Sequence, residues 1–137
     1  MKYLFILVSL CYTASQAPEQ PLEIRITGEV QAGKTVLVAL YRAEDEFPSD
    51  RSAFKHATVV ADGTEVTVQF DVPYGDYAAA VYMDENGNGK LDKTMIGFPK
   101  EPFGFSNGFR PKTGKPKFKN CKFIFSEEAP KAMIRIH

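Results

Sequence analysis

The sequence has little of what builds most catalytic sites and cross-links. It contains no tryptophan, two histidines and two cysteines among 137 residues. A general base needs a positioned neighbour, and neither His56 nor His137 has one that the sequence reveals. Gly-x-Ser-x-Gly, His-Glu-x-x-His and a phosphate-cradling glycine loop are also missing. The common signatures of hydrolases, metalloproteases and nucleotide-binding enzymes are therefore excluded, and a binding role is favoured over an enzymatic one.

The sequence also lacks net charge. Seventeen basic and seventeen acidic residues balance to zero, with histidine neutral. Binding to nucleic acid or to an anionic membrane requires a concentration of positive charge. Neither is therefore expected as a partner.

The one long apolar run lies at the beginning of the chain. It extends from Tyr3 to Tyr12, follows Lys2, and is succeeded by the small residues Ser15-Gln16-Ala17. Such a run is too short to span a membrane as a helix, and this order is typical of a cleaved signal peptide. We predict a signal peptide at residues 1–17 and a single domain at residues 18–137. The mature protein would be secreted or periplasmic, without an integral membrane segment.

The two cysteines do not form an internal disulfide in this scheme. Cys11 would leave with the signal peptide, and the preceding Leu10 is too large for a lipidation site. Cys121 lies in the apolar stretch 118–125, so we expect a buried apolar residue rather than a reactive thiol. A domain of about 120 residues can build a sizeable core without a disulfide.

Alternating apolar and polar residues predict an all-β domain. The stretches 22–30 and 66–72 each alternate as strands with one face on a core do, whereas 36–41 is apolar on both faces and should be central. Further strands are expected at 77–83, 118–125 and 132–136. The charged segment 43–57 interrupts the pattern. About seven short strands separated by turns predict an antiparallel sandwich whose two inner faces form the core.

The most specific motif is the acidic loop 84–92. Oxygen-bearing side chains occupy its first, third, fifth and ninth positions, which is the spacing of a calcium loop, and Gly89 occupies the sixth, where the backbone turns sharply. The predicted ligands of Ca²⁺ are the side chains of Asp84, Asn86, Asn88 and Asp92 and the carbonyl of Lys90.

This loop departs from an EF-hand. Its twelfth position is Met95 rather than a bidentate Glu, so the loop should extend from a strand, with further ligands from Asp71, Asp76, Glu101, a carbonyl or water. Two Asn in place of Asp favour weak binding, suited to calcium-rich extracellular fluid. A metal-free turn is the alternative, because Asn-Gly is a strong turn signal and occurs twice here.

A second unusual segment, residues 97–110, contains four phenylalanines among glycines and prolines. It shows neither the strand nor the helix period, and loops of this kind often bind ligands. The candidate ligand-binding residues are Phe103, Phe105, Asn107 and Arg110. A carbohydrate or a peptide would suit them. Alternatively, the phenylalanines close one end of the sandwich.

Several motifs in one order resemble a known family. They are Val38–Tyr41, Val72–Tyr77, the loop 84–92, Gly97–Pro99 and Gly104–Asn107. Together they resemble the bacterial secreted family numbered 2141 among the domains of unknown function, over Ile24 to Ile136. The Pro-x-Gly-x-Tyr turn also resembles prealbumin domains, which implies a transthyretin-like Greek-key sandwich. The resemblance implies export, this fold and the acidic loop, but no reaction.

The sequence thus predicts an exported, calcium-stabilised β-sandwich with a binding or accessory role. A small exported enzyme of unknown class and a purely structural domain remain as alternatives.

Overall fold

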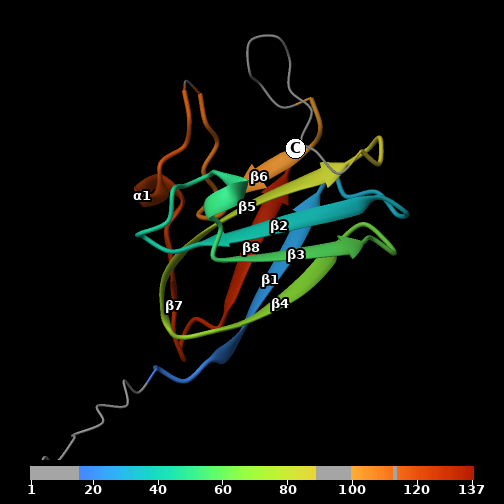
Figure 1. Cartoon of the computed structure of the whole chain (residues 1–137). Coiled ribbons are helices and arrows are strands. Elements are labelled where there is room, and N and C mark those ends of the chain that lie inside the picture. Colours follow the sequence, from blue (N-terminus) through green and yellow to red (C-terminus); the bar gives the residue numbers. More distant parts are fainter. Residues whose placement is uncertain (1–15, 89–99, 113) are drawn as a thin grey trace, which may run out of the picture.

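The computed structural model describes residues 16–88, 100–112 and 114–137. Its strands form two sheets that lie face to face, with their strands crossing at a wide angle (Figure 1). The three-stranded sheet has the order β4 (Val66–Val72), β1 (Gln20–Gly28), β8 (Lys131–Ile136). The second sheet has the order β3 (Lys55–Val60), β2 (Thr35–Tyr41), β5 (Gly75–Asp84), β6 (Phe103–Phe105), with β7 (Phe123–Phe125) also paired to β5. Two single turns of helix complete the described elements, η1 (Asp50–Ser52) and α1 (Phe118–Cys121).

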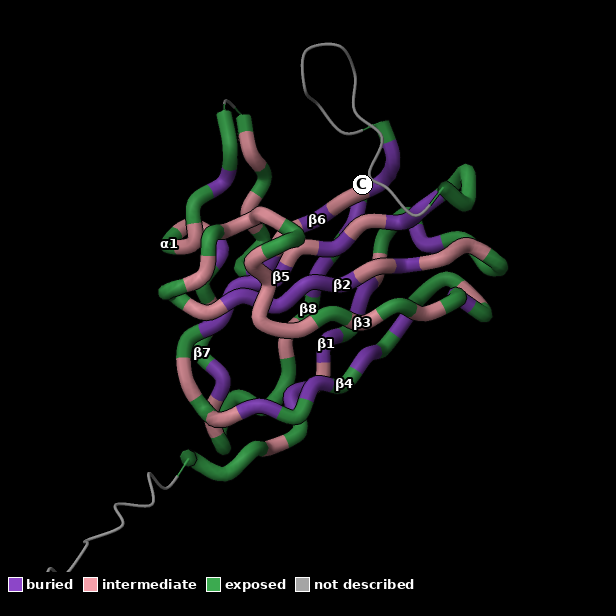
Figure 2. The backbone as a smooth tube through the Cα atoms, in the orientation of Figure 1, coloured by how far each residue is buried: buried purple, intermediate pink, exposed green. Residues whose placement is uncertain are grey.

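The core lies between the sheets, where the alternating strands place their apolar side chains. In β1, Leu22, Ile24 and Ile26 have no exposed surface, whereas the residues between them face outward (Figure 2). β4 supplies the matching buried row, and its Val68 pairs with Ile24. Burying each large aliphatic side chain stabilises the fold by about 1.5–3 kcal/mol. The predicted strand at 66–72 is therefore confirmed, as is the all-β class, and the strand predicted at 22–30 ends two residues earlier, at Gly28.

The prediction of a wholly antiparallel sandwich is wrong at one pairing. β1 and β8 run parallel, with Ile24 opposite Ala132 and Ile26 opposite Ile134. These are the first and last strands of the described chain. No hairpin joins them, so nothing local imposes the antiparallel direction.

The number and position of the strands also differ from the prediction of seven. The described residues contain eight, because two strands form where none was expected: β3 begins at Lys55, inside the charged segment 43–57, and β6 lies inside the segment 97–110. The expected strand at 118–125 is shorter: residues 118–121 form α1, and only Phe123–Phe125 reaches a partner, the first residues of β5. A three-residue strand leaves too few residues for its alternation to be distinguished from the helical turn before it.

Two short strands and one side chain share the outer edge of β5. β7 pairs with Gly75–Tyr77 and β6 pairs with Ala80–Tyr82, which leaves Ala78 and Ala79 between them. Ser106 fills this gap: its backbone N–H donates to the Ala79 carbonyl at 3.0 Å, and its Oγ accepts from the Ala79 N–H at 2.8 Å. The loop after β6 is thereby fixed to the sheet.

Cys121 is fully buried, which confirms its predicted role as a small apolar residue. Burial raises the pKa of its thiol from 9.0 to about 12. We therefore expect no reaction with a thiol-specific disulfide reagent at pH 8 until denaturant unfolds the chain. Because the unfolded thiol ionises at lower pH than the folded one, stability should fall as the pH rises from about 9 toward 12. Rapid labelling of the folded protein would contradict this burial.

The predicted signal peptide at residues 1–17 lies outside the described residues, apart from Gln16 and Ala17. No helix in the described part of the chain is both long and apolar enough to cross a membrane.

Candidate functional site

The described half of the acidic loop begins at the end of β5. Asp84 is the last residue of that strand, pairs with Thr35 of β2, and is only 4% exposed. Its carboxylate is therefore held at the rim of the sandwich by the sheet itself. Carboxylates are rarely buried to this extent unless another group compensates their charge.

Side-chain oxygens turn the backbone of this loop. Asp84 Oδ1 accepts a hydrogen bond from the Gly87 N–H at 3.0 Å, and Asn86 Oδ1 accepts one from the Asn88 N–H at 3.1 Å. Gly87 has a φ of 75°, a conformation that residues with a side chain rarely adopt. These bonds fold residues 84–88 into a tight turn at the end of β5.

Glu101 is the second buried carboxylate at this loop. It is 5% exposed, and its Oε1 accepts a hydrogen bond from the Glu85 N–H at 3.1 Å. The other two acidic residues suggested as additional ligands lie elsewhere. Asp76 is eight residues from Asp84 along β5, roughly 26 Å in an extended strand, and Asp71 lies in β4 of the other sheet. Of the three, the fold brings only Glu101 to the loop.

The surroundings of the loop contain charges of both signs. Lys34 Nζ donates to the Glu85 carbonyl at 2.8 Å. Burial, followed by the carboxylates of Asp50, Asp84 and Glu101, raises the pKa of Tyr82. The negative charges of these carboxylates therefore disfavour ionisation of the Tyr82 hydroxyl. Within the described ranges, no three His, Cys, Asp or Glu side chains are grouped so that they could hold a metal ion, and the predicted ligands Lys90 and Asp92 fall outside these ranges.

The four candidate ligand-binding residues differ in their surroundings, although the rings of Phe103 and Phe105 pack edge-to-face with centroids 5.8 Å apart. Phe105 packs edge-to-face against Phe47, with ring centroids 5.9 Å apart, as expected of a residue that closes the sandwich. Asn107 has a φ of 59° and donates through Nδ2 to the Asn120 carbonyl, so it shapes a turn. Phe103 and Arg110, in contrast, line the same cavity.

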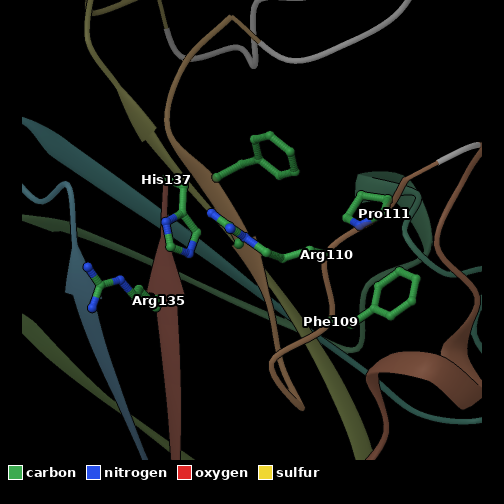
Figure 3. A pocket seen from close by; sticks show the side chains of 7 residues that line it. Phe109, Arg110, Pro111, Arg135 and His137 are labelled. Carbon is green, nitrogen blue, oxygen red and sulfur yellow. The ribbon is translucent and has the colours of Figure 1, made fainter.

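This cavity has a volume of about 180 Å³ and lies where β6 meets β8 (Figure 3). The Phe103 N–H donates to the His137 carbonyl, and the His137 N–H donates back to the Phe103 carbonyl. A Cβ on Gly104 would lie 2.4 Å from the Arg135 carbonyl oxygen, so only glycine allows this approach. The lining residues are Phe103, Gly104, Phe109, Arg110, Pro111, Arg135 and His137.

Sequence reasoning missed the side of the cavity that comes from β8. His137 and Arg135 are distant in sequence from Arg110, and the bonding of Phe103 in β6 to His137, the residue after β8, brings them together. Burial, then the charges of Arg110 and Arg135, lowers the pKa of His137, whereas Glu29 opposes the shift. The cavity is therefore an environment that disfavours an additional positive charge.

Comparison with known proteins gives one match. A family model described as an uncharacterized protein conserved in bacteria (DUF2141) matches residues 24–133. No match was found among curated proteins or among solved structures.

Proposed function

The chain belongs to this bacterial family of uncharacterized proteins, and we propose that it is an exported β-sandwich module with a binding or accessory role, stabilised by Ca²⁺ in the loop that follows β5. Export is supported by the apolar run and small residues of the first 17 positions. Since calcium is abundant outside cells, a weak site would be occupied there. We extend the proposal to a transthyretin-like Greek key, which is supported by chain connections that pass between sheets, from β1 to β2 and from β3 to β4.

One observation carries the calcium assignment. Two buried carboxylates, Asp84 and Glu101, come from separate segments and meet at a loop that already presents oxygens at alternate positions. Ca²⁺ takes six to eight oxygen ligands, and carboxylates supply both ligands and charge. The proposed ligands are Asp84, Asn86, Asn88, Asp92 and the Lys90 carbonyl, with Glu101 as a further candidate.

The same rim provides the proposed ligand-binding surface. Glu101 holds the acidic loop, and two residues later Phe103 lines the cavity. An ion that orders the loop would therefore also order one wall of the cavity. A carbohydrate or peptide bound there would gain affinity in calcium, because less conformational entropy would remain to be lost on binding.

We expect calcium to raise the thermal unfolding midpoint of residues 18–137. A ligand at one hundred times its dissociation constant stabilises a folded protein by about 2.7 kcal/mol, which corresponds to a rise of roughly 10 °C for a domain of this size. Asp84→Asn should remove most of the rise, because it removes a charged ligand while preserving shape. Melting curves recorded in chelator and across a calcium titration measure the effect.

Asp62→Asn is the matched control. Asp62 is exposed in the turn at Asp62-Gly63, which is not part of the loop 84–92, so this variant should respond to calcium as the parent does. Glu101→Gln provides a second test if Asp84→Asn folds poorly. An unchanged midpoint up to millimolar calcium would make 84–92 a metal-free turn, and an undiminished shift in Asp84→Asn would refute the ligand assignment.

A further inference from the structure

The cavity between β6 and β8 combines positive charge with apolar walls. Arg110 and Arg135 both line it, and none of the ion pairs within the described residues involves either of them. Phe103, Phe109 and Pro111 supply the apolar part of the lining. In binding pockets, apolar walls provide affinity and a few placed polar groups provide orientation.

Arg110 is the cation best placed to receive a ligand. Its guanidinium lies beside the imidazole of His137, whereas the guanidinium of Arg135 is directed away from both (Figure 3). Arg110 is exposed and belongs to the loop that Ser106 fixes to β5, so the position of its backbone is defined while its donors face solvent. A guanidinium presents paired N–H donors in a planar fork, which matches a carboxylate.

We propose that this cavity binds the carboxylate of a small organic acid with an apolar body, with Arg110 as the anchoring donor and the Phe103 and Phe109 side chains as the apolar contacts. The inference rests on the proposed binding function and names the chemical class of its ligand. A volume of about 180 Å³ is below the usual range for a drug-sized ligand, so the cavity takes one terminal group. That group belongs to a free acid or to the C-terminal residue of a peptide.

His137 couples this binding to pH. The charged groups that face it are Arg110, Arg135 and Glu29. A bound carboxylate adds negative charge beside the ring and favours its protonated form, so binding takes up a proton. Affinity should therefore rise as the pH falls from 8 to 6, until the carboxylate itself is protonated near pH 4.

The test is a titration of the calcium-loaded protein, residues 18–137, with phenylacetate, followed by heteronuclear NMR. The expected result is saturable shifts at Phe103, Phe109 and His137. Arg110→Gln should weaken binding at least tenfold, and Arg51→Gln, which removes an exposed arginine outside the cavity, should leave it unchanged. His137→Gln should remove the pH dependence, whereas His56→Gln should retain it.

Further probes separate the sources of the carboxylate and the ways in which the inference could fail. A tripeptide ending in a free phenylalanine that binds more tightly than phenylacetate identifies a peptide terminus, and the reverse order identifies a free acid. The inference is overturned if phenylacetamide or inorganic sulfate binds as tightly as phenylacetate. It is also overturned if Arg110→Gln binds phenylacetate with undiminished affinity. Binding of neutral sugars or of amidated peptides without any binding of phenylacetate would overturn it while preserving the proposed binding function.

Discussion

Replacing Gly28 with alanine should lower the free energy of unfolding by about 2–5 kcal/mol, because two separate effects act at this position. Gly28 has a φ of 95°, which strains any residue with a side chain. A Cβ built there would also lie 2.2 Å from the carbonyl oxygen of Ile136, its partner across the parallel pair. Backbone cannot give way as a flexible side chain can, so β1 and β8 must separate.

Gly33→Ala isolates the first effect. Gly33 has a φ of 83°, but an added Cβ would meet no atom within 4 Å. We expect this variant to lose only the strain, about 1–2 kcal/mol. Urea unfolding at 25 °C compares the two, and equal losses would show that the close approach to Ile136 contributes nothing. Since domains of this kind are stable by about 5–15 kcal/mol, Gly28→Ala should also reduce the yield of folded protein.

The parallel pairing at Gly28 shows where sequence reasoning reaches its limit. The alternation of Leu22, Ile24 and Ile26 predicted a strand and its buried face, because both depend on neighbouring residues. The direction of its partner depends on residues more than a hundred positions away, and no local pattern encodes it. The glycine itself was a signal of close backbone approach within an otherwise regular strand.

The two parts of the candidate site, the acidic loop and the cavity, also differ in whether local sequence reveals them. The acidic loop could be recognised from spacing alone, since its oxygens lie within nine residues. The cavity could not, because Arg110 meets His137 only after β6 bonds to the last residues of the chain. The surroundings of Asn107 were equally hidden, because its amide donates to the Asn120 carbonyl, a partner that the sequence does not reveal.

Ser106→Ala, like Gly28→Ala, should have a large effect on stability. We expect it to lower the free energy of unfolding by about 2–4 kcal/mol. The Ser106 hydroxyl is fully buried; it accepts from the Ala79 N–H and donates to the Cys121 carbonyl at 2.5 Å. Alanine would leave both backbone groups buried without these partners, and each such group costs about 1–3 kcal/mol. Ser126→Ala is the control, because the Ser126 hydroxyl bonds to the Ala129 N–H at an exposed turn, and we expect a loss of about 0.5 kcal/mol or less.

The loss of the Ser106 hydroxyl should also affect residues to which it makes no hydrogen bond. This side chain joins β5, the loop after β6 and the end of α1, so its removal should loosen the segment that carries Phe109 and Arg110. Amide hydrogen exchange measures this locally: protection at Ala79 and along 106–110 should fall in Ser106→Ala, while protection in β1 and β4 follows only the change in global stability. In Gly28→Ala we expect the reverse: protection should fall first in β1 and β8, where the added Cβ lies, while protection along 106–110 follows only the change in global stability. Uniform loss of protection in both variants would mean that the two regions unfold as one unit, and the loop at the cavity would then be no more independent than the core.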